Sequence, residues 1–188
     1  MHYDAGVFHR FTANIDTRVS IYCIVVDNYI VANSADIYHA ENSYGYNMDE
    51  VRFSGVEAEF NAMVFERLSL FGNYTFRETD YDKDDILADA VLLQLAPKHK
   101  ANLSARYKWL DNTLLTADIR YMGERKTEGD VYTLDAFTLV DVGVEQRLGA
   151  NTTIHAYAGN IFGESYEEVY GFPMPKHTFG INIKMTFF

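Results

Sequence analysis

The sequence predicts an all-β protein, specifically an antiparallel up-and-down transmembrane β-barrel, and three patterns in its 188 residues support this fold class. First, apolar and polar residues alternate with a period of two over long segments, as in strands whose two faces meet different environments. Second, short and long connections alternate strictly along the chain. Third, the polar faces of the segments have charged side chains of both signs at mid-strand.

The alternation predicts about nine strands of roughly ten residues each. The clearest is SGVEAEFNAMV (54–64), in which Val56 and Phe60 alternate with Glu57 and Glu59. The closing stretch KHTFGINIKMTFF (176–188) alternates in the same way, although the ends of soluble domains are usually frayed. The other strands are expected near residues 3–11, 17–30, 50–63, 68–78, 98–109, 113–122, 136–148 and 151–160.

The connections divide into two classes that predict a meander. Short links, TANID, VFER, LDN and GAN, join the strands within successive pairs. The other links, near residues 31–49, 79–97, 123–135 and 161–177, are long and rich in Asp, Glu, Tyr, Asn and Gly. Tight turns on one rim and long loops on the other follow from this strict alternation.

The charged residues indicate which face of the sheet points into the barrel. A soluble barrel such as a lipocalin points apolar residues inward, whereas an outer-membrane barrel points them at lipid and has a polar lumen. Charges at mid-strand favour the second arrangement, with Cys23 as a small buried or lipid-facing residue. The residues expected to face the lumen and a plug are Glu57, Glu59, Arg106, Asp118, Arg120, Glu145, Arg147 and Lys184.

Aromatic residues end the apolar faces, as the interfacial girdles of membrane barrels do. Examples are Tyr107, Trp109, Tyr121 and Phe187. The alternative is an ordinary half-exposed antiparallel sheet whose aromatic residues form a core.

An odd strand count conflicts with a closed barrel, because bacterial single-chain barrels have even numbers of strands. Open strand edges are not tolerated in lipid. We therefore expect this chain to be one arc of a larger barrel. No signal peptide follows Met1, which for an exported protein would mean that an earlier segment is missing.

Composition and motifs argue against several other functions. The net charge of −11 disfavours nucleic-acid binding, and no apolar run approaches the roughly 20 residues of a membrane helix. We expect no cofactor, no metal site and no enzymatic activity. Glu57 and Glu59 are better explained as lumen lining than as paired catalytic carboxylates. His155, His99 and His177 have no partner at metal-ligand spacing.

The strand sequences resemble those of TonB-dependent outer-membrane receptors. The pair VRFSGVEAEFN and LSLFGNYTFRETD is similar to two late strands of that family, and LAPKHKANLSARYKW is similar to the next one. The segment from FTLVDVGVEQRLG to the terminal phenylalanines resembles the end of the family's barrel. The resemblance implies that residues 1–188 are the C-terminal portion of a 22-stranded barrel whose plug domain and early strands are absent.

The resemblance also implies a function and partners. The receptor would import a scarce nutrient, such as a siderophore, haem or cobalamin, across the bacterial outer membrane. Its implied partners are outer-membrane lipid, the plug domain, the remaining strands, TonB through the missing N-terminal part, and a ligand that the sequence does not identify. External-loop residues expected to contact this ligand are Tyr44, Tyr46, Tyr81, Tyr132, Tyr166, Tyr170 and Phe172.

The last two residues, Phe187 and Phe188, would form a C-terminal signal for barrel assembly. Phe187 is in phase with the apolar face and Phe188 is not, so the strand would bulge near its end or the signal would be imperfect. Two other readings stay open at this point. One is a small complete outer-membrane barrel of structural or adhesion type, with an extra strand in DIYHAENSYGYN (36–47); the other is a soluble lipocalin-like barrel.

Overall fold

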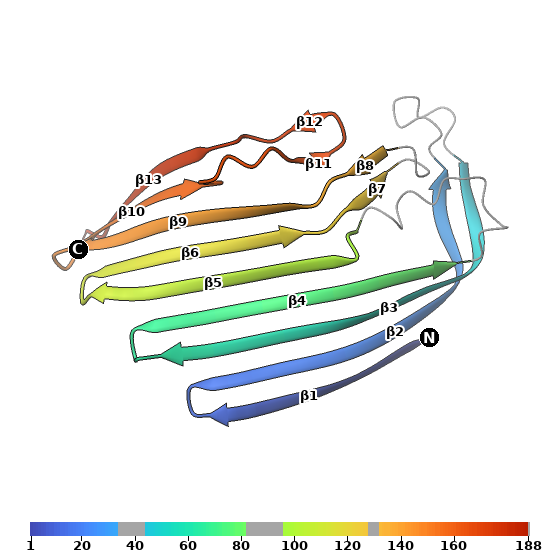
Figure 1. Ribbon diagram of the computed structural model, residues 1–188, viewed down its shortest axis with the longest axis horizontal. Coiled ribbons are helices and arrows are strands. Elements are labelled where there is room, and N and C mark those ends of the chain that lie inside the picture. The colour runs from blue at the N-terminus through green and yellow to red at the C-terminus, as the bar shows by residue number, and fades with distance from the viewer. Residues whose placement is uncertain (34–43, 82–95, 128–131, 188) are drawn as a thin grey trace.

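Nine strands form one continuous antiparallel sheet in the computed structural model, which describes residues 1–33, 44–81, 96–127 and 132–187 (Figure 1). No described residue forms a helix, so none of these segments provides a helix that could span a membrane. In spatial order the strands are β1 (His2–Thr12), β2 (Ile15–Asn33), β3 (Tyr44–Val64), β4 (Leu68–Tyr81), β5 (His99–Leu110), β6 (Thr113–Met122), β9 (Phe137–Leu148), β10 (Thr152–Gly159) and β13 (Thr178–Met185).

The two faces of the sheet differ as the sequence predicts. Residues directly opposite each other in antiparallel strands place their side chains on the same face. Glu59 lies opposite Arg18 and Asn73, and Asp118 lies opposite Ser104. We call the face with these residues the polar face.

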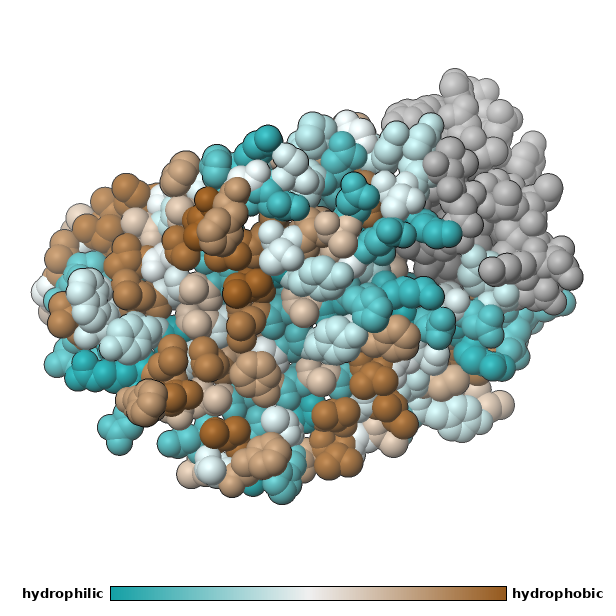
Figure 2. Space-filling model, viewed as in Figure 1, coloured by the Kyte–Doolittle hydropathy of each residue, from teal (hydrophilic) through white to brown (hydrophobic). Residues whose placement is uncertain are grey.

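The other face, called the apolar face, leaves large hydrophobic side chains exposed. Ile21, Phe60, Leu103, Ile119, Val142 and Ile183 are at least 37% exposed. Figure 2 shows hydrophobic side chains over the left and central part of the view and hydrophilic ones toward the long connections. Exposed apolar surface of this extent is expected where lipid replaces water.

The short and long connections lie on opposite rims of the sheet. The turns after β1, β3, β5 and β9 gather at the left of Figure 1, which we call the turn rim, and the long connections lie at the outer rim on the right. The turn after β3 has positive φ at both Phe65 (54°) and Glu66 (57°), which is the backbone of a type I′ turn. Phe65 is 89% exposed at its tip.

The strands continue past the predicted boundaries at the outer rim. β2 reaches Asn33 and β3 starts at Tyr44, so the predicted connection 31–49 was too long. Two predicted loops also contain small hairpins, β7 (Arg125–Thr127) with β8 (Tyr132–Leu134), and β11 (Glu167–Val169) with β12 (Phe172–Pro173). Period-two alternation fades there, because strands beyond the bilayer meet water on both faces.

Aromatic rings cover glycines of neighbouring strands at three places. A Cβ built on Gly72 would lie 2.1 Å from a ring carbon of Phe60, and one built on Gly180 would lie 2.3 Å from the ring of Tyr157. Only glycine leaves space for such a ring against the backbone. The three aromatic–glycine pairs are Tyr22–Gly55, Phe60–Gly72 and Tyr157–Gly180.

Few apolar side chains are fully buried among the described residues: Met48, Val51, Leu134, Phe137 and Leu139. Met48 and Val51 pack with Tyr29, Phe53 and Tyr81. Val51 and Phe53 belong to the polar face by register, so this face also has apolar side chains near the outer rim.

The sheet has two open edges within the described residues, because β1 pairs only with β2 and β13 only with β10. The chain ends lie at opposite rims (Figure 1). After β13 one further backbone bond joins Thr186 N to Asn151 O at 3.0 Å. Phe187 is 86% exposed, and Phe188 lies outside the described residues. The proposed role of both in assembly therefore stays a prediction.

Candidate functional site: the inner wall and the outer hairpins

The eight residues predicted to face the lumen all lie on the polar face. Glu57 and Glu59 belong to β3, and the register continues this face through β5, β6, β9, β10 and β13. Their positions on the face follow from the backbone, whereas their contact with a plug stays a prediction. The other six are Arg106, Asp118, Arg120, Glu145, Arg147 and Lys184.

Polar side chains of this wall bond across strands. Asn102 Nδ2 donates to Asn73 Oδ1 at 2.9 Å, and Asn61 Nδ2 donates to Asp16 Oδ1 at 3.0 Å. The Ser104 hydroxyl donates to Asp118. These bonds satisfy groups that would be costly to leave unpaired away from water.

A recess of about 580 Å³ opens near the turn rim. Arg106 and Asp16 supply its charges, whereas Phe71 and Met63 supply apolar surface. Phe71 lies opposite Asn61 and Ser104, so its ring belongs to the polar face. The recess therefore offers both an apolar contact and charges of both signs on the inner wall.

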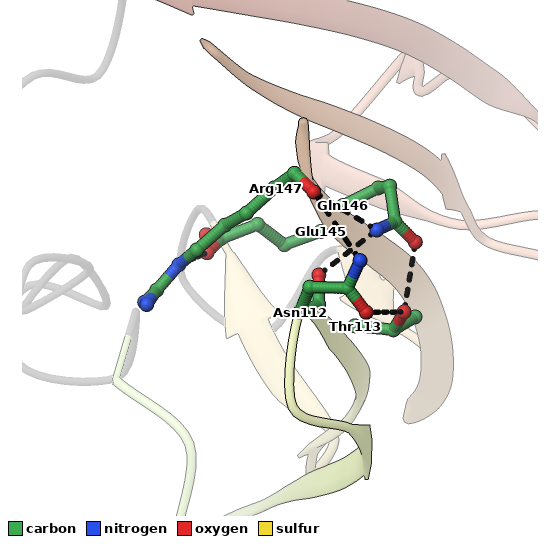
Figure 3. Close-up of polar contacts among 5 residues, drawn as sticks. All are labelled: Asn112, Thr113, Glu145, Gln146 and Arg147. Atoms are coloured by element: carbon green, nitrogen blue, oxygen red, sulfur yellow. Dashed lines mark hydrogen bonds and ion pairs between the residues drawn. The ribbon is translucent and has the colours of Figure 1, made fainter. Parts of the chain in front are cut away.

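The turn rim is held by a network around Gln146 (Figure 3). Gln146 Nε2 donates to the carbonyl oxygens of Asn112 and Arg147, both at 3.1 Å, and its Oε1 accepts from Thr113 Oγ1 at 2.7 Å. Figure 3 shows the side chains of Glu145 and Arg147 projecting away from these three contacts. Glu145 Oε1 lies 3.7 Å from Arg147 Nε. Sequence patterning did not single out Gln146, because its partners are mostly backbone atoms.

The connection after β10 is anchored by Asn160, which is 5% exposed and has φ of 50°. Its backbone N donates to Asp141 Oδ1 at 2.7 Å, its Nδ2 to Glu164 O at 2.8 Å, and its Oδ1 accepts from Glu164 N at 2.9 Å. His177 Nδ1 lies 3.0 Å from Asn160 O. This anchor was missed by the sequence analysis, although an asparagine directly after a strand is a turn signal.

The two outer hairpins contact each other through an arginine. Arg125 Nη2 donates to Glu167 O at 3.0 Å and Arg125 Nη1 donates to Glu168 O at 3.4 Å. Burial lowers the pKa of the Arg125 guanidinium, and the nearby Glu168 carboxylate raises it. Arg120 Nη1, from the barrel wall, lies 3.7 Å from Glu168 Oε1.

Four of the seven aromatic residues predicted to contact ligand lie at these hairpins. The rings of Tyr132 and Tyr170 stack with centroids 4.0 Å apart, and those of Tyr166 and Phe137 lie 4.5 Å apart. Phe172 is 60% exposed. The structure thus brings Tyr132 and Tyr170 together from two loops, which the sequence alone could not show.

The other three predicted aromatic residues lie elsewhere on the outer rim. Tyr81 packs against the Met48–Val51 cluster, and so it is a structural contact as well as a ligand candidate. Tyr44 and Tyr46 begin β3, and their side chains lie outside the described part of the structure. Ligand contact by all seven stays a prediction.

Metal ligation finds no support in the described residues, which contain no group of three or more His, Cys, Asp or Glu suited to a metal ion. His99 Nδ1 instead lies 2.7 Å from the Tyr74 hydroxyl. His155 lies opposite Glu145 and Asn182 on the polar face.

Two proteins with known names illustrate what this chain is similar to. The metal-pseudopaline receptor CntO of Pseudomonas aeruginosa is 29% identical over 131 residues, which are 66% of this chain and 18% of the relative. The iron-regulated outer membrane virulence protein of Vibrio cholerae is 29% identical over 155 residues, 79% of this chain and 23% of the relative. This chain thus spans only about a fifth of the length of these relatives.

The fold matches solved receptor barrels. The ferric-catecholate import receptor Fiu of Escherichia coli K12 superimposes with a TM-score of 0.76 at 16% identity, over 99% of this chain and 27% of that one. These matches support neither the small complete barrel nor the lipocalin-like barrel.

A family model described as TonB dependent receptor-like, β-barrel, matches residues 2–161. Together with the two-faced antiparallel sheet, this match shows that the chain belongs to the TonB-dependent receptor β-barrels of the bacterial outer membrane.

Proposed function

We propose that residues 1–188 form the C-terminal portion of the barrel of an outer-membrane receptor that imports a scarce ligand with energy supplied through TonB. The chain supplies barrel wall and external loops. The proposal rests above all on the two-faced sheet, which follows receptor barrels over almost its whole length. A family of receptors rather than of enzymes supports a transport role for this chain.

The ligand class we favour is a metal held by an organic chelator. The relatives include a metal-pseudopaline receptor and a ferric-catecholate import receptor. The outer mouth of this chain offers aromatic rings, among them Tyr132, Tyr170 and Phe172, and the guanidinium of Arg120, which lies 3.7 Å from the Glu168 carboxylate. Such a surface suits organic ligands with both apolar and anionic groups.

The inner wall would contact a plug domain. Charges enclosed in a barrel need partners or water, and within the described part of the chain Glu57, Glu59 and Lys184 form no ion pair with their own wall. The recess beside Phe71 and Arg106 would accept an apolar side chain together with a polar group of the plug.

An uptake experiment tests this function. The full-length receptor containing this chain would be produced in an Escherichia coli strain without its own ferric-siderophore receptors, with tonB intact or deleted. Radioactive iron would be offered as a catecholate, a hydroxamate and a metal–pseudopaline type complex. We expect uptake of at least one complex, and only with tonB intact.

Two results would overturn the proposal. One is the absence of uptake for all three iron complexes, and for haem and labelled cobalamin offered in a parallel assay, while the receptor is present in the outer membrane. The other is uptake that persists at the same rate without tonB, because a passive pore needs no energy coupling.

A further inference from the structure

The outer hairpins, β7–β8 and β11–β12, belong to connections separated by two strands of the sheet, yet they contact each other by several kinds of interaction. The guanidinium of Arg125 donates to two consecutive carbonyl oxygens of β11, those of Glu167 and Glu168. The rings of Tyr132 and Tyr170 stack at 4.0 Å. Hydrogen bonds and ring stacking therefore join the same two elements.

Arg125 lies at the centre of this contact. Its guanidinium carbon lies 5.9 Å from the ring centroid of Phe137, which is 3% exposed. Its Nε is shielded from water and has no hydrogen-bond partner among the described residues. A guanidinium can donate to two neighbouring acceptors from one rigid plane, which an ammonium group cannot do. The geometry thus requires arginine and not merely a positive charge.

The same contact reaches the barrel wall. Arg120 on β6 pairs with the carboxylate of Glu168, whose carbonyl oxygen accepts from Arg125. Phe137, beneath the Arg125 guanidinium, and Leu134, opposite Arg125 in the β7–β8 hairpin, are buried, whereas most apolar side chains of the described chain are exposed. The hairpins are therefore fixed to the wall on one side.

We propose that Arg125 joins the two outer hairpins into one rigid unit and so positions the stacked Tyr132 and Tyr170 at the mouth of the barrel. Arg125 is a positioning residue, because it acts through the hairpins and not on the ligand. The unit itself follows from contacts within the chain, and its use in ligand capture rests on the proposed function.

Hydrogen exchange followed by mass spectrometry tests the unit without any ligand. In the full-length receptor, Arg125→Ala should speed amide exchange in both hairpins, by about tenfold or more because at least one charge-assisted bond is lost. Exchange in β5 and β6 should not change. The exchange rates of Arg125→Lys should lie between those of the parent and of Arg125→Ala. Lysine keeps the positive charge but cannot donate to both carbonyl oxygens from one plane.

The matched control is Lys176→Ala, which removes a positive charge from an exposed position of the same connection as β11 and β12. It should leave exchange in both hairpins unchanged. The proposal fails when Arg125→Ala speeds exchange in β7–β8 alone, or in neither hairpin. An effect confined to its own hairpin would show a local structural role only.

A second measurement tests the consequence for binding of the iron complex. With the iron complex that supports uptake, Arg125→Ala should raise the KM for uptake at least fivefold, with little change in the maximal rate, and Arg125→Lys should restore part of the loss. Unchanged KM in a variant with uncoupled hairpins would refute the positioning role. If no complex is taken up, the proposed function fails, and the exchange result still decides whether the rigid unit exists.

Discussion

Neighbouring residues on one strand of this sheet lie on opposite faces, one apolar and the other polar. On β6, Ala117 lies on the apolar face opposite Ala105 and Val142, whereas Thr116 lies on the polar face opposite Arg106. The two positions are one residue apart near the middle of the strand. They therefore form a matched pair for testing which face contacts lipid.

We expect Ala117→Arg to destabilise the full-length receptor by about 2–4 kcal/mol, the usual cost of an arginine facing the middle of the bilayer. Thr116→Arg, which points into the lumen, should have a much smaller effect. Equilibrium unfolding by denaturant in phospholipid vesicles measures both. Equal losses of stability, or a larger loss for Thr116→Arg, would contradict the assigned orientation.

The turn after β5 provides a test of electrostatics outside the membrane. Lys108 Nζ lies 3.1 Å from Asp111 Oδ1, and this bond lowers the pKa of the Asp111 carboxyl. A lowered pKa means that the ionised form stabilises the fold. The contribution is present above the unfolded pKa, about 3.9, and is lost as pH falls through the folded value.

Lys108→Ala should therefore move the titration midpoint of Asp111 upward, toward the ordinary value. Carbon-detected NMR of specifically labelled receptor follows this midpoint. Because Asp111 is exposed, we expect almost no change in overall stability at pH 7. A midpoint that does not move would show that the bond to Lys108 is not the cause of the shift.

At the scale of whole elements, the network around Gln146 connects the turn after β5 to β9. Gln146 donates to the carbonyls of Asn112 and Arg147 through its amide nitrogen and accepts from Thr113, which is 5% exposed. Removal of the amide would take one donor from each of two carbonyl oxygens at the turn rim, where Asn112 O would still accept from Arg147 N at 2.9 Å. Gln146→Glu is the sharpest change, because it keeps the shape and loses both donated bonds.

Gln146→Glu should lower stability by about 1–3 kcal/mol, in the range for lost hydrogen bonds to partly buried groups. The thermal midpoint of the detergent-solubilised receptor measures this loss. Glu66→Gln, at an exposed position of the turn after β3, is the control and should change little. A Gln146→Glu variant as stable as the parent would show that water replaces the network.

The sequence predicted the long strands of the sheet better than the strand ends and the short strands at the outer rim. All nine strands of the large sheet were expected, because lipid on one side and a polar lumen on the other impose a period of two. Strand ends such as Asn33 and the short strands β7, β8, β11 and β12 were not expected, because no such contrast exists beyond the bilayer. The eight wall residues were placed on one face by periodicity alone. The Arg125 contact and the anchor at Asn160 depend on tertiary neighbours and left no repeating signal.

At the scale of the whole molecule, the sheet lacks closure within the described residues. β1 and β13 each leave one edge without a partner, and lipid offers no hydrogen bonds to replace one. The odd number of strands places the two chain ends at opposite rims. Further strands of the same barrel are the proposed partners of both edges.

Residues 1–188 produced alone should not form a stable monomer in detergent. Heat-modifiable migration on a gel and resistance to protease measure folding of such barrels. The full-length receptor, treated in parallel, should show both properties. A cooperative, protease-resistant monomer of residues 1–188 would mean that the two edges can be satisfied within this chain.

The aromatic–glycine pairs also bear on how the strands find one another. A slip of two residues between β10 and β13 would bring Tyr157 against Asn182 or Thr178 instead of Gly180. Phe60 would likewise meet Leu70 or Tyr74 instead of Gly72. Side chains at those positions leave no space for a ring lying flat on the backbone. Each aromatic–glycine pair therefore disfavours a shifted register by steric clash, and so helps to select the correct strand pairing during barrel assembly.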